Sequence, residues 1–420
     1  MLLSVLSANS QEVIEADYEL QVENNAVHKY LEEVVYEPHG ASVVDAYREG
    51  VSYRMDYPSS LSMTLPLVEV SSTSGNPSST YTIVCCDDQT LSDSLTFEVA
   101  STAGEASLCN FIPNRTYRYQ VLDGETLLKQ GKIHTSGQMR MITIPGTNLF
   151  NIRDIGGWKT VDNKRIKYGK ILRGCELNGS RIATNEGIEL LRQLGVEAEI
   201  DMRAFYNTHN ISAFGFLNAS QTPAGEVATY YYTDDSGQLP EHMSIYKWQY
   251  RWRKEFEFIV NNLRKGRCVY EHCVSGKDRT GFLSFLLEGL LGVPYNELVK
   301  DYELSYFAYH IESTKETIDK VFDYINGLDG ETLRDKFNHY FKNVLYVSQD
   351  NIDYFRTAML EDVVDDGVVT FIEPADCRIC TDGYDDVWYD LHGRQVRHPQ
   401  PGLLYLQRTV NGRTRKVFCR

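Results

Sequence analysis

Short runs of strand-forming residues fill the first third of the chain, and clusters of Gly, Ser, Asn and Asp separate them. The runs lie at residues 61–70, 79–88, 94–101, 106–124 and 125–137. Runs of this length and spacing are typical of a β-sandwich. Upstream, the apolar positions of residues 26–35 have helical spacing. The pattern therefore predicts a β-sandwich over residues 41–140, after a lead-in segment at residues 11–40.

Strand-like and helix-like segments alternate between residues 145 and 361. Two strands are expected at residues 197–203 and 228–234, and a long helix is expected at residues 246–266. A short apolar strand at residues 268–272 then leads through a tight loop into a helix that is apolar on nearly every side. This alternation predicts an α/β domain with a central, mostly parallel sheet flanked by helices on both faces.

The end of the chain, residues 362–420, has a different pattern. Four strand-like runs between residues 387 and 418 are separated by turn residues, the last of them Asn411-Gly412. These runs predict a small C-terminal β element beside the two larger parts.

The composition limits the classes of protein. The chain has 420 residues, more than one hydrophobic core usually takes, with 42% hydrophobic and 24% charged residues as in ordinary globular proteins. A net charge of -16 argues against a nucleic-acid partner, because a phosphate backbone is bound by a basic face. No apolar run reaches the roughly 18 residues of a membrane helix, so no integral membrane segment is expected.

Cys273 and Arg279 stand six positions apart in the tight loop before the apolar helix. The first N–H groups of a helix are unpaired and the helix dipole adds positive charge there, so the loop is an anion site. A cysteine at such a site has a pKa below the ordinary value of about 8.5. The planar fork of an arginine binds two oxygens of a phosphoryl group. The pair predicts hydrolysis of phosphate esters through a cysteinyl-phosphate.

The string HCVSGKDRTG at residues 272–281 resembles the signature loop of the protein-tyrosine phosphatase superfamily. With Lys277 and Asp278 in this loop, the string resembles the atypical bacterial branch that includes secreted tyrosine and phosphoinositide phosphatases. Other motifs of that branch are matched in order and spacing by residues 150–158, 168–178 and 190–203. Two positions depart from it: Gly174 replaces the usual serine, and residues 204–210 stand where a glutamate soon follows in the family. The resemblance implies a cysteine-phosphatase domain at residues 145–361.

The resemblance also implies that Cys273 is the nucleophile and that Arg279 binds the phosphoryl oxygens. The residues expected around the phosphate are Val274, Ser275, Gly276, Lys277 and Thr280. Thr280 is expected to hydrogen-bond the departing sulfur, and His272 is expected to orient the loop. Lys277 either adds positive charge for doubly phosphorylated or inositol head groups or is a solvated surface lysine. No metal or cofactor is expected.

The general acid is expected among four aspartates, because the chain lacks the W-P-D string of other superfamily members. The candidates are Asp201, Asp278, Asp234 and Asp235. Asp201 ends a strand expected beside the catalytic strand and Asp278 belongs to the loop itself, so these two are favoured. Each candidate also has a structural interpretation. Asp201 would pair with an arginine such as Arg203 or Arg173, and the other pair would form an ordinary turn.

Residues 111–121, FIPNRTYRYQV, resemble the corner of fibronectin type III-like domains. In that corner a tyrosine, here Tyr117, hydrogen-bonds back across the turn. The sandwich is therefore expected to be fibronectin type III-like and to position or present the catalytic domain.

Both ends of the chain indicate export. Residues 1–10 are similar to the remnant of a secretory signal, so the mature chain is expected to begin near Gln11. Residues 362–420 resemble C-terminal elements of many exported proteins of Bacteroidetes bacteria. The alternatives are a plain N-terminus and a small β appendage. The expected location is periplasmic, on the outer surface or secreted.

The nine cysteines are an odd number, and only residues 377–380, CRIC, have suggestive spacing. A zinc site would need a second pair nearby, so a disulfide or no role is expected there. An oxidising compartment would threaten the Cys273 thiolate, and Cys175 and Cys268 are the candidates for a protective partner.

The sequence predicts an enzyme, a protein-tyrosine phosphatase-like phosphoric monoester hydrolase. Phosphotyrosine peptides and phosphoinositides are the expected substrates, which would give it dual specificity. The alternatives are a non-catalytic protein that binds phosphorylated ligands and a surface adhesion protein with a vestigial phosphatase domain. Turnover of an aryl phosphate, abolished by Cys273→Ser, separates the first from the others.

Overall fold

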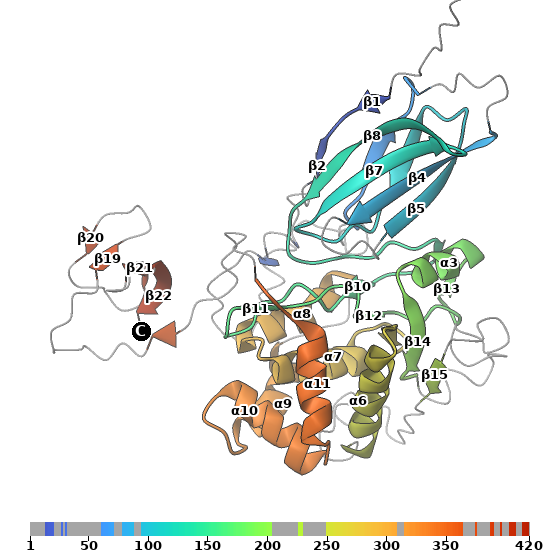
Figure 1. The fold of residues 1–420 in the computed structure, drawn as a ribbon. Helices are drawn as coiled ribbons and strands as arrows, with labels where there is room; N and C mark the ends of the chain where they lie inside the picture. The colour runs from blue at the N-terminus through green and yellow to red at the C-terminus, as the bar shows by residue number, and fades with distance from the viewer. Residues whose placement is uncertain are drawn as a thin grey trace, which may run out of the picture.

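The structure is a computed structural model, and it contains an N-terminal β part, an α/β part and a small C-terminal β part (Figure 1). Side chains and backbone are described for residues 13–20, 27, 30–31, 60–70, 78–87, 94–203, 249–308 and most of 315–363. The backbone alone is described for strands at residues 226–229 and within residues 374–419. In these parts of the chain, no helix is both long and apolar enough to cross a membrane.

The N-terminal part contains two sheets that share one core. The larger has the order β1-β8-β7-β4-β5, and β2 also pairs with β8. Its strands are β1 (Ile14–Glu15), β2 (Tyr18–Leu20), β4 (Thr80–Asp87), β5 (Ser94–Ala100), β7 (Thr116–Asp123) and β8 (Thr126–Thr135). The smaller sheet pairs β3 (Met63–Pro66) with β6 (Glu105–Leu108). Both sheets contribute side chains to the core, among them Leu65, Ile83, Leu108 and Tyr119.

The corner before β7 is held by Tyr117. Its hydroxyl accepts a hydrogen bond from the backbone N–H of Ile112 at 2.9 Å, and its ring packs edge-on against Phe111. Asn110 and Asn114 turn the chain there with φ values of 66 and 56 degrees, a left-handed conformation that asparagine tolerates. The hydrogen bond expected across this corner is therefore present.

The α/β part is built on a five-stranded sheet in the order β10-β12-β16-β14-β15. Its strands are β10 (Arg153–Asp154), β12 (Ile171–Gly174), β16 (Cys268–His272), β14 (Val196–Asp201) and β15 (Glu226–Thr229). Every neighbouring pair is parallel except β10 with β12, which agrees with the mostly parallel sheet predicted. The strand expected at residues 228–234 corresponds to β15 at residues 228 and 229, and residues 230–234 lie outside the described residues.

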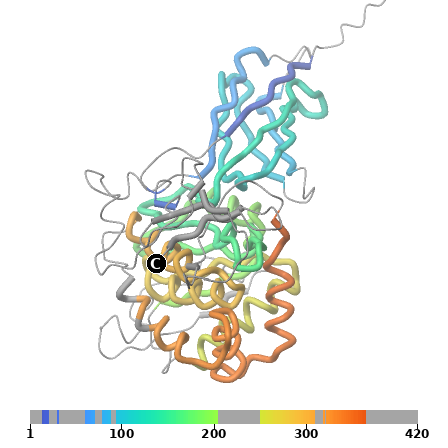
Figure 2. The backbone as a smooth tube through the Cα atoms, turned by 90° about the vertical axis from the view of Figure 1, so that its left-hand side faces the viewer, coloured from blue at the N-terminus to red at the C-terminus, as the bar shows by residue number. Residues whose placement is uncertain are grey.

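The two faces of this sheet belong to two different cores. Ile171 and Val269 face one core, and their neighbours Leu172 and Tyr270 face the other. The first core is filled by α6 (Gln249–Arg264), α7 (Asp278–Leu291), α8 (Tyr295–Ala308), α9 (Lys315–Asn326), α10 (Leu333–His339) and α11 (Gln349–Met359). The second core holds α3 (Asn185–Gln193) and continues into the N-terminal sheets, which stand above the α/β part (Figures 1 and 2). Helices were expected on both faces, but α6 to α11 cover one face, whereas the other is covered largely by this shared core, to which α3 contributes.

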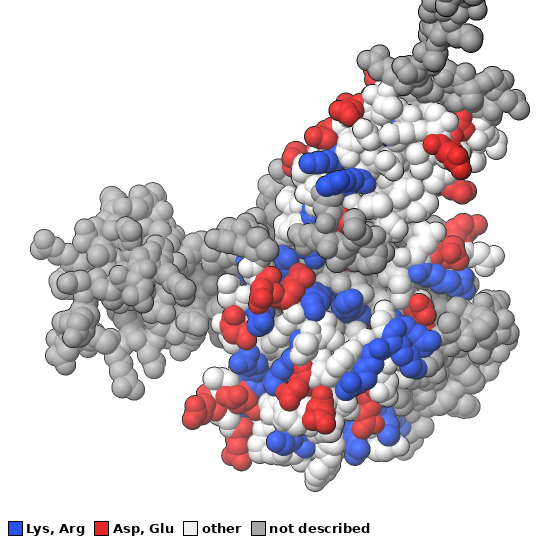
Figure 3. All heavy atoms as spheres, viewed as in Figure 1, with Lys and Arg blue, Asp and Glu red and all other residues white. Residues whose placement is uncertain are grey.

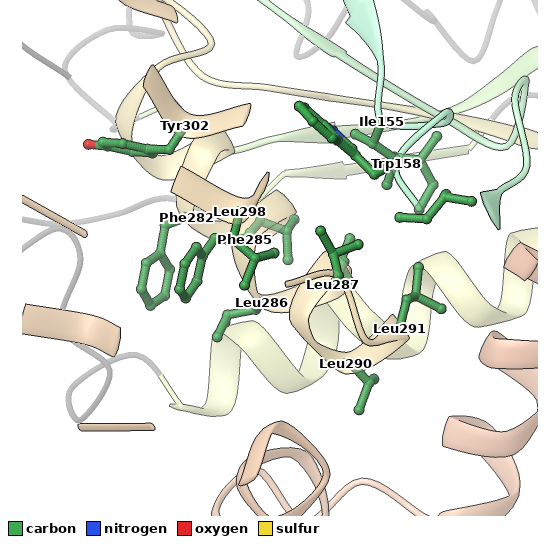
Figure 4. Packing of buried hydrophobic residues seen from close by; sticks show 14 of the residues in the cluster. Ile155, Trp158, Phe282, Phe285, Leu286, Leu287, Leu290, Leu291, Leu298 and Tyr302 are labelled. Carbon is green, nitrogen blue, oxygen red and sulfur yellow. The ribbon is translucent and has the colours of Figure 1, made fainter. Parts of the chain in front are cut away.

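Helix α7 is buried on all sides, as its apolar composition predicted (Figure 4). The ring centroid of Phe282 lies 4.6 Å from that of Trp252, and that of Phe285 lies 5.6 Å from that of Phe337. The helix is capped at its end by Gly292, whose φ of 94 degrees is a left-handed value that glycine adopts readily. Packing on every side fixes this helix, and with it the loop that precedes it.

A short N-terminal piece of the chain docks on α8. Tyr30 is fully buried, its hydroxyl donates to Glu303 Oε2 at 2.6 Å, and its ring centroid lies 5.6 Å from that of Phe307. Lys300 Nζ donates to the backbone oxygen of Leu31 at 3.3 Å. These contacts tie residues far upstream to a helix of the α/β part.

The C-terminal part forms a five-stranded sheet in the order β18-β22-β21-β19-β20. Its strands are β18 (Pro374–Ala375), β19 (Val387–Tyr389), β20 (Gln395–Val396), β21 (Leu403–Arg408) and β22 (Thr414–Cys419). The four strand-like runs predicted between residues 387 and 418 correspond to β19, β20, β21 and β22.

Candidate active site

The loop between β16 and α7 lies at the carboxyl end of the central strand, where ligands of open α/β sheets bind. β16 ends at His272 and α7 begins at Asp278. Gly276 has a φ of 65 degrees, and a Cβ at this position would lie 2.3 Å from the carbonyl oxygen of Gly174. Only glycine allows so close an approach. The loop is therefore seated directly against the end of β12.

Gly174, which departs from the family motif, has its own reason to be glycine. A Cβ there would lie 2.4 Å from the hydroxyl oxygen of Tyr270 and 2.9 Å from Cγ1 of Ile152. The Tyr270 hydroxyl donates to the backbone oxygen of Cys175 at 2.7 Å, so its position is fixed. In this chain Tyr270 fills the space that a larger residue at position 174 would need.

Cys273 is only 3% exposed, yet its thiol is more acidic than those of Cys175 and Cys268. Burial raises the pKa of Cys273, but the charge of Arg279 and the hydroxyl and backbone N–H of Thr280 outweigh burial and bring this pKa below its ordinary value. Cys175 and Cys268, the suggested protective partners, are free thiols. Burial raises the pKa of Cys175 to about 12 and raises that of Cys268 as well. The loop thus favours the thiolate at position 273 and not at its neighbours.

Arg279 is anchored to the adjacent strand. Its Nη1 donates to the backbone oxygen of Met202 at 2.7 Å, and Met202 directly follows β14. A free arginine side chain loses much rotamer entropy when it binds a ligand. This hydrogen bond restricts the Arg279 guanidinium before any ligand binds. The charge of the same guanidinium lowers the pKa of Cys273.

His272 is fully buried between two hydrogen-bond acceptors. Its Nε2 lies 2.6 Å from Glu199 Oε1, and its Nδ1 lies 3.1 Å from the backbone oxygen of Cys273. A carbonyl and a carboxylate both accept, so this arrangement suits an imidazolium, whose two ring nitrogens both donate. Burial lowers the pKa of His272, but the nearby Asp201 and the bonded Glu199 raise it above its ordinary value. The ring holds the backbone of Cys273, which is the orienting position expected of it.

Asp201 ends β14 opposite His272, so the strand runs beside the catalytic strand as expected. Arg203 binds both oxygens of its carboxylate: Nε lies 2.9 Å from Oδ1, and Nη2 lies 2.5 Å from Oδ2. Burial raises the pKa of Asp201, but the charges and hydrogen bonds of His272 and Arg203 bring it below its ordinary value. A carboxylate held in this way stays ionised. The geometry corresponds to the ion pair considered for Asp201.

One set of side chains is close enough together to hold a metal ion. It consists of Glu199, Asp201 and His272, each with one donor atom within 4.8 Å of the other two. Their donor atoms are already engaged, because Glu199 binds His272 and Arg203 binds Asp201. The cluster is a hydrogen-bonded support beneath the loop.

Asp278 is the first residue of α7, and its side chain is 23% exposed. Its Oδ1 lies 3.3 Å from Lys277 Nζ and accepts a hydrogen bond from Tyr302 at 3.4 Å. The Lys277 side chain is only 2% exposed, so it is not the solvated surface lysine that the sequence left open. Asp234 and Asp235, the other acid candidates, lie outside the described residues.

Three residues that contact the loop were missed in the sequence. Asn151 and Arg173 donate to the carbonyl oxygen of Gly276 at 3.0 Å each, and Tyr302 donates to Asp278. Asn151 and Arg173 fall inside two of the segments that resemble family motifs, which was the available signal. Tyr302 belongs to α8 and carries no such signal.

Residues 144–363 match the model of the family described as "Tyrosine phosphatase family". The match covers more than half of the chain, which therefore belongs to the tyrosine phosphatase family.

Two curated relatives and one solved structure illustrate the similarity. A protein of Cupriavidus necator named as a candidate tyrosine-protein phosphatase is 24% identical over 165 residues, 37% of this chain and 59% of that relative. The triple specificity protein phosphatase PtpB of Mycobacterium tuberculosis is 32% identical over 93 residues, 22% of this chain and 31% of its own length. The crystal structure of PTPMT1 in complex with PI(5)P aligns with 17% identity and a TM-score of 0.27, over 42% of this chain and 95% of that chain. The matched segments thus span less than two thirds of both curated relatives.

Proposed function

We propose that the chain hydrolyses phosphate monoesters with Cys273 as a nucleophile, through a cysteinyl-phosphate and without a metal ion. The observation that carries this proposal is the position of Cys273 in the loop before α7, with Arg279 anchored on Met202, and the lowered pKa of Cys273 agrees with it. A thiolate at an amide-lined anion site is both nucleophilic and close to a bound phosphoryl group.

In the proposed reaction the Cys273 thiolate attacks phosphorus, a sulfur–phosphorus bond forms and the bond to the leaving oxygen breaks. The leaving oxygen takes a proton from a general acid. Water then attacks phosphorus, inorganic phosphate leaves and the thiolate is restored, with Thr280 as hydrogen-bond partner of the sulfur. Arg279 and the amides of Val274, Ser275, Gly276 and Lys277 balance the charge on the phosphoryl oxygens.

Asp278 is the proposed general acid. It lies on the loop, its side chain is part-exposed, and its described neighbours at 3.3 and 3.4 Å do not clamp both of its oxygens. Asp201, by contrast, has both oxygens on Arg203. Asp201 then serves to hold Arg203 and the charged His272 in place.

The proposed substrates are phosphotyrosine peptides and phosphoinositides. The triple specificity named for the Mycobacterium tuberculosis relative supports a site that accepts more than one class of phosphate ester. The charge of Lys277 next to the phosphate loop agrees with substrates that carry additional phosphates. A panel of phosphopeptides and phosphoinositide head groups would identify the preferred class.

The direct test is turnover of a generic aryl phosphate in the presence of EDTA. Wild-type protein should be active, and Cys273→Ser and Arg279→Lys should both be inactive, because an ammonium group does not reproduce the bidentate fork. Full activity of Cys273→Ser, or activity lost to EDTA and restored by a divalent cation, would contradict the proposal. A wild-type protein that binds inorganic phosphate without turnover would instead support the non-catalytic alternative.

The remaining parts of the chain are proposed to position the catalytic domain and to direct the protein to its location. The Tyr117 corner and the two sheets that share a core support a fibronectin type III-like sandwich at residues 41–140. Residues 145–361 would then form the catalytic domain and residues 362–420 a sorting element of an exported protein. Mass spectrometry of the protein from its native host should find a mature N-terminus near Gln11. An intact Met1 in the cytosolic fraction would exclude export.

A further inference from the structure

A loop that points its backbone N–H groups at a phosphoryl group must point carbonyl oxygens the other way. Those oxygens then face the protein interior, where an unpaired carbonyl is costly and can turn the peptide around. The cradle therefore depends on donors behind it as well as on the amides in front.

Asn151 supplies such a donor from the segment before β10. Its Nδ2 lies 3.1 Å from the carbonyl oxygen of Ser275 and 3.0 Å from that of Gly276. Its Oδ1 accepts a hydrogen bond from Arg153 Nη1 at 2.5 Å, which fixes the orientation of the amide with its nitrogen toward the loop. Asn151 is fully buried, so no solvent replaces it.

Arg173 supplies the second donor from β12. Its Nη2 lies 3.0 Å from the carbonyl oxygen of Gly276, and its Nη1 binds a carboxylate oxygen of Asp301. Asp301 Oδ1 also accepts a hydrogen bond from Arg153 Nε at 3.1 Å. Burial raises the pKa of Asp301, but the two arginines bring it below its ordinary value, so it stays a carboxylate. The three side chains are at most 1% exposed and form one rigid support.

We propose that Asn151 and Arg173, held by Arg153 and Asp301, are positioning residues that keep the carbonyls of Ser275 and Gly276 turned away from the phosphate, an inference that rests on the proposed function. Without these donors the loop peptides are free to rotate, and the cradle loses amides aimed at the phosphoryl oxygens. Oxyanion binding and the low pKa of the Cys273 thiol both depend on that aim, although neither residue touches the substrate.

The test uses two variants of the full chain and two matched controls. Asn151→Gly removes the amide and suits the φ of 60 degrees at this position, and Arg173→Lys keeps a charge for Asp301 but not a fork that also reaches Gly276. Asn110→Gly is the control for the first, because Asn110 is also fully buried, has a φ of 66 degrees and donates to a carbonyl, that of Thr143. Arg165→Lys is the control for the second, because Arg165 is also buried and binds a carboxylate, that of Glu361.

Two quantities are measured on each protein after thermal unfolding has shown that it is folded. One is the affinity for tungstate, an oxyanion of phosphate shape, by calorimetry. The other is the thiol pKa, from the pH dependence of iodoacetamide labelling followed on the peptide that contains Cys273. A residue that only stabilises the core would change the unfolding temperature and neither of these quantities.

Asn151→Gly and Arg173→Lys should weaken tungstate binding by about tenfold or more and raise the thiol pKa, whereas both controls should leave the two quantities unchanged. If Asn151→Gly does not fold, Arg173→Lys decides the matter alone. Folded variants with wild-type tungstate affinity and thiol pKa would overturn the inference. Turnover by the wild-type protein is scored separately, so an inactive wild type contradicts the proposed function while tungstate affinity still tests the loop support.

Discussion

Two aspartates near Cys273 differ in what already binds them. Arg203 holds both oxygens of Asp201, and protonation of that carboxylate would break a buried ion pair. Removing one partner of a buried pair typically costs several kcal/mol. Asp278 is part-exposed, and its contacts with Lys277 and Tyr302 both fall on one oxygen, so the other oxygen is not held by an ion pair of this kind.

Asp278→Asn should therefore make the rate depend more steeply on the pKa of the leaving group. A good leaving group departs without a proton, whereas a poor one needs it, so poor aryl phosphates should slow by about 100-fold or more and good ones far less. The measurement is the turnover rate across a series of aryl phosphates. Asp201→Asn is the matched variant and should lower stability without steepening this dependence. Steepening in Asp234→Asn or Asp235→Asn alone would move the acid to one of those residues.

The glycines of the loop region show how far a single-residue argument reaches. Gly276 was expected among the residues around the phosphate, and its close approach to Gly174 explains why this residue is glycine. The substitution at Gly174 was visible in the sequence, but its reason was not. That reason is the hydroxyl of Tyr270, a residue 96 positions away in the chain that reaches across from the neighbouring strand.

At the scale of elements, β16 and α7 are joined by a hydrogen bond to a buried acid, Glu271, which has no role in the proposed reaction. Glu271 lies on β16 and accepts a hydrogen bond from Ser284 of α7 at 2.5 Å. Burial raises the pKa of Glu271 to about 7, and the pKa of Glu297 on α8 is raised to about 7 for the same reason. Both acids are protonated in the folded protein at pH values where an unfolded chain would have lost the proton.

This difference predicts a pH-dependent stability. Between the ordinary pKa of 4.5 and the folded value of about 7, the folded state binds more protons, so the free energy of unfolding falls as pH rises. Glu271 alone accounts for a fall of up to about 3 kcal/mol in the free energy of unfolding, at roughly 1.4 kcal/mol per pKa unit. Urea unfolding of Glu271→Gln, which keeps an acceptor for Ser284, should show a smaller fall over this window than wild type. Parallel curves for the two proteins would refute the assignment, and Glu297→Gln provides the matched comparison.

The elements themselves were largely predictable, and the contacts between them were not. The strand, loop and apolar helix around Cys273 follow from local composition, and so do β3 to β8 of the N-terminal part. β1 and β2 were not predicted, because they lie in the segment expected to be a lead-in. The contacts of Asn151 and Arg173 with Gly276 join positions 125 and 103 residues apart, which no local pattern reveals. The ion pair of Asp201 with Arg203 was open to prediction, because both fall in the strand expected at residues 197–203 and residues two apart on a strand point to the same side.

At the scale of the whole molecule, the N-terminal sheets and one face of the catalytic sheet share a hydrophobic core. An ion pair crosses the same region: Arg115, which lies 3.4 Å from Asp87 of the N-terminal part, also lies 3.5 Å from Glu361, at the end of the α/β part. On the face that Figure 3 draws, acidic and basic side chains are interspersed over the described α/β part. Attraction of an anionic substrate then depends on the charges at the loop itself, because exposed charges are screened within about 10 Å.

The docked N-terminal segment should contribute measurably to stability. Tyr30→Phe removes the hydroxyl that donates to the buried Glu303 and should lower the free energy of unfolding by about 1–3 kcal/mol. The measurement is urea unfolding of the full chain. Tyr346→Phe is the control, because the Tyr346 side chain is 72% exposed, and it should change the stability little. Equal effects of the two substitutions would mean that the Tyr30 contact does not stabilise the fold.

The central claim is that phosphate passes through the sulfur of Cys273, and a rapid-quench experiment tests it most directly. Enzyme mixed with an excess of aryl phosphate is quenched in acid within one turnover, and its peptides are weighed by mass spectrometry. We expect a phosphate on the peptide that contains Cys273 in the wild-type protein, more of it in Asp278→Asn if that residue also assists the attack of water, and none in Cys273→Ser. Turnover by the wild-type protein with no phosphate on this peptide, or with phosphate on another residue, would contradict the account.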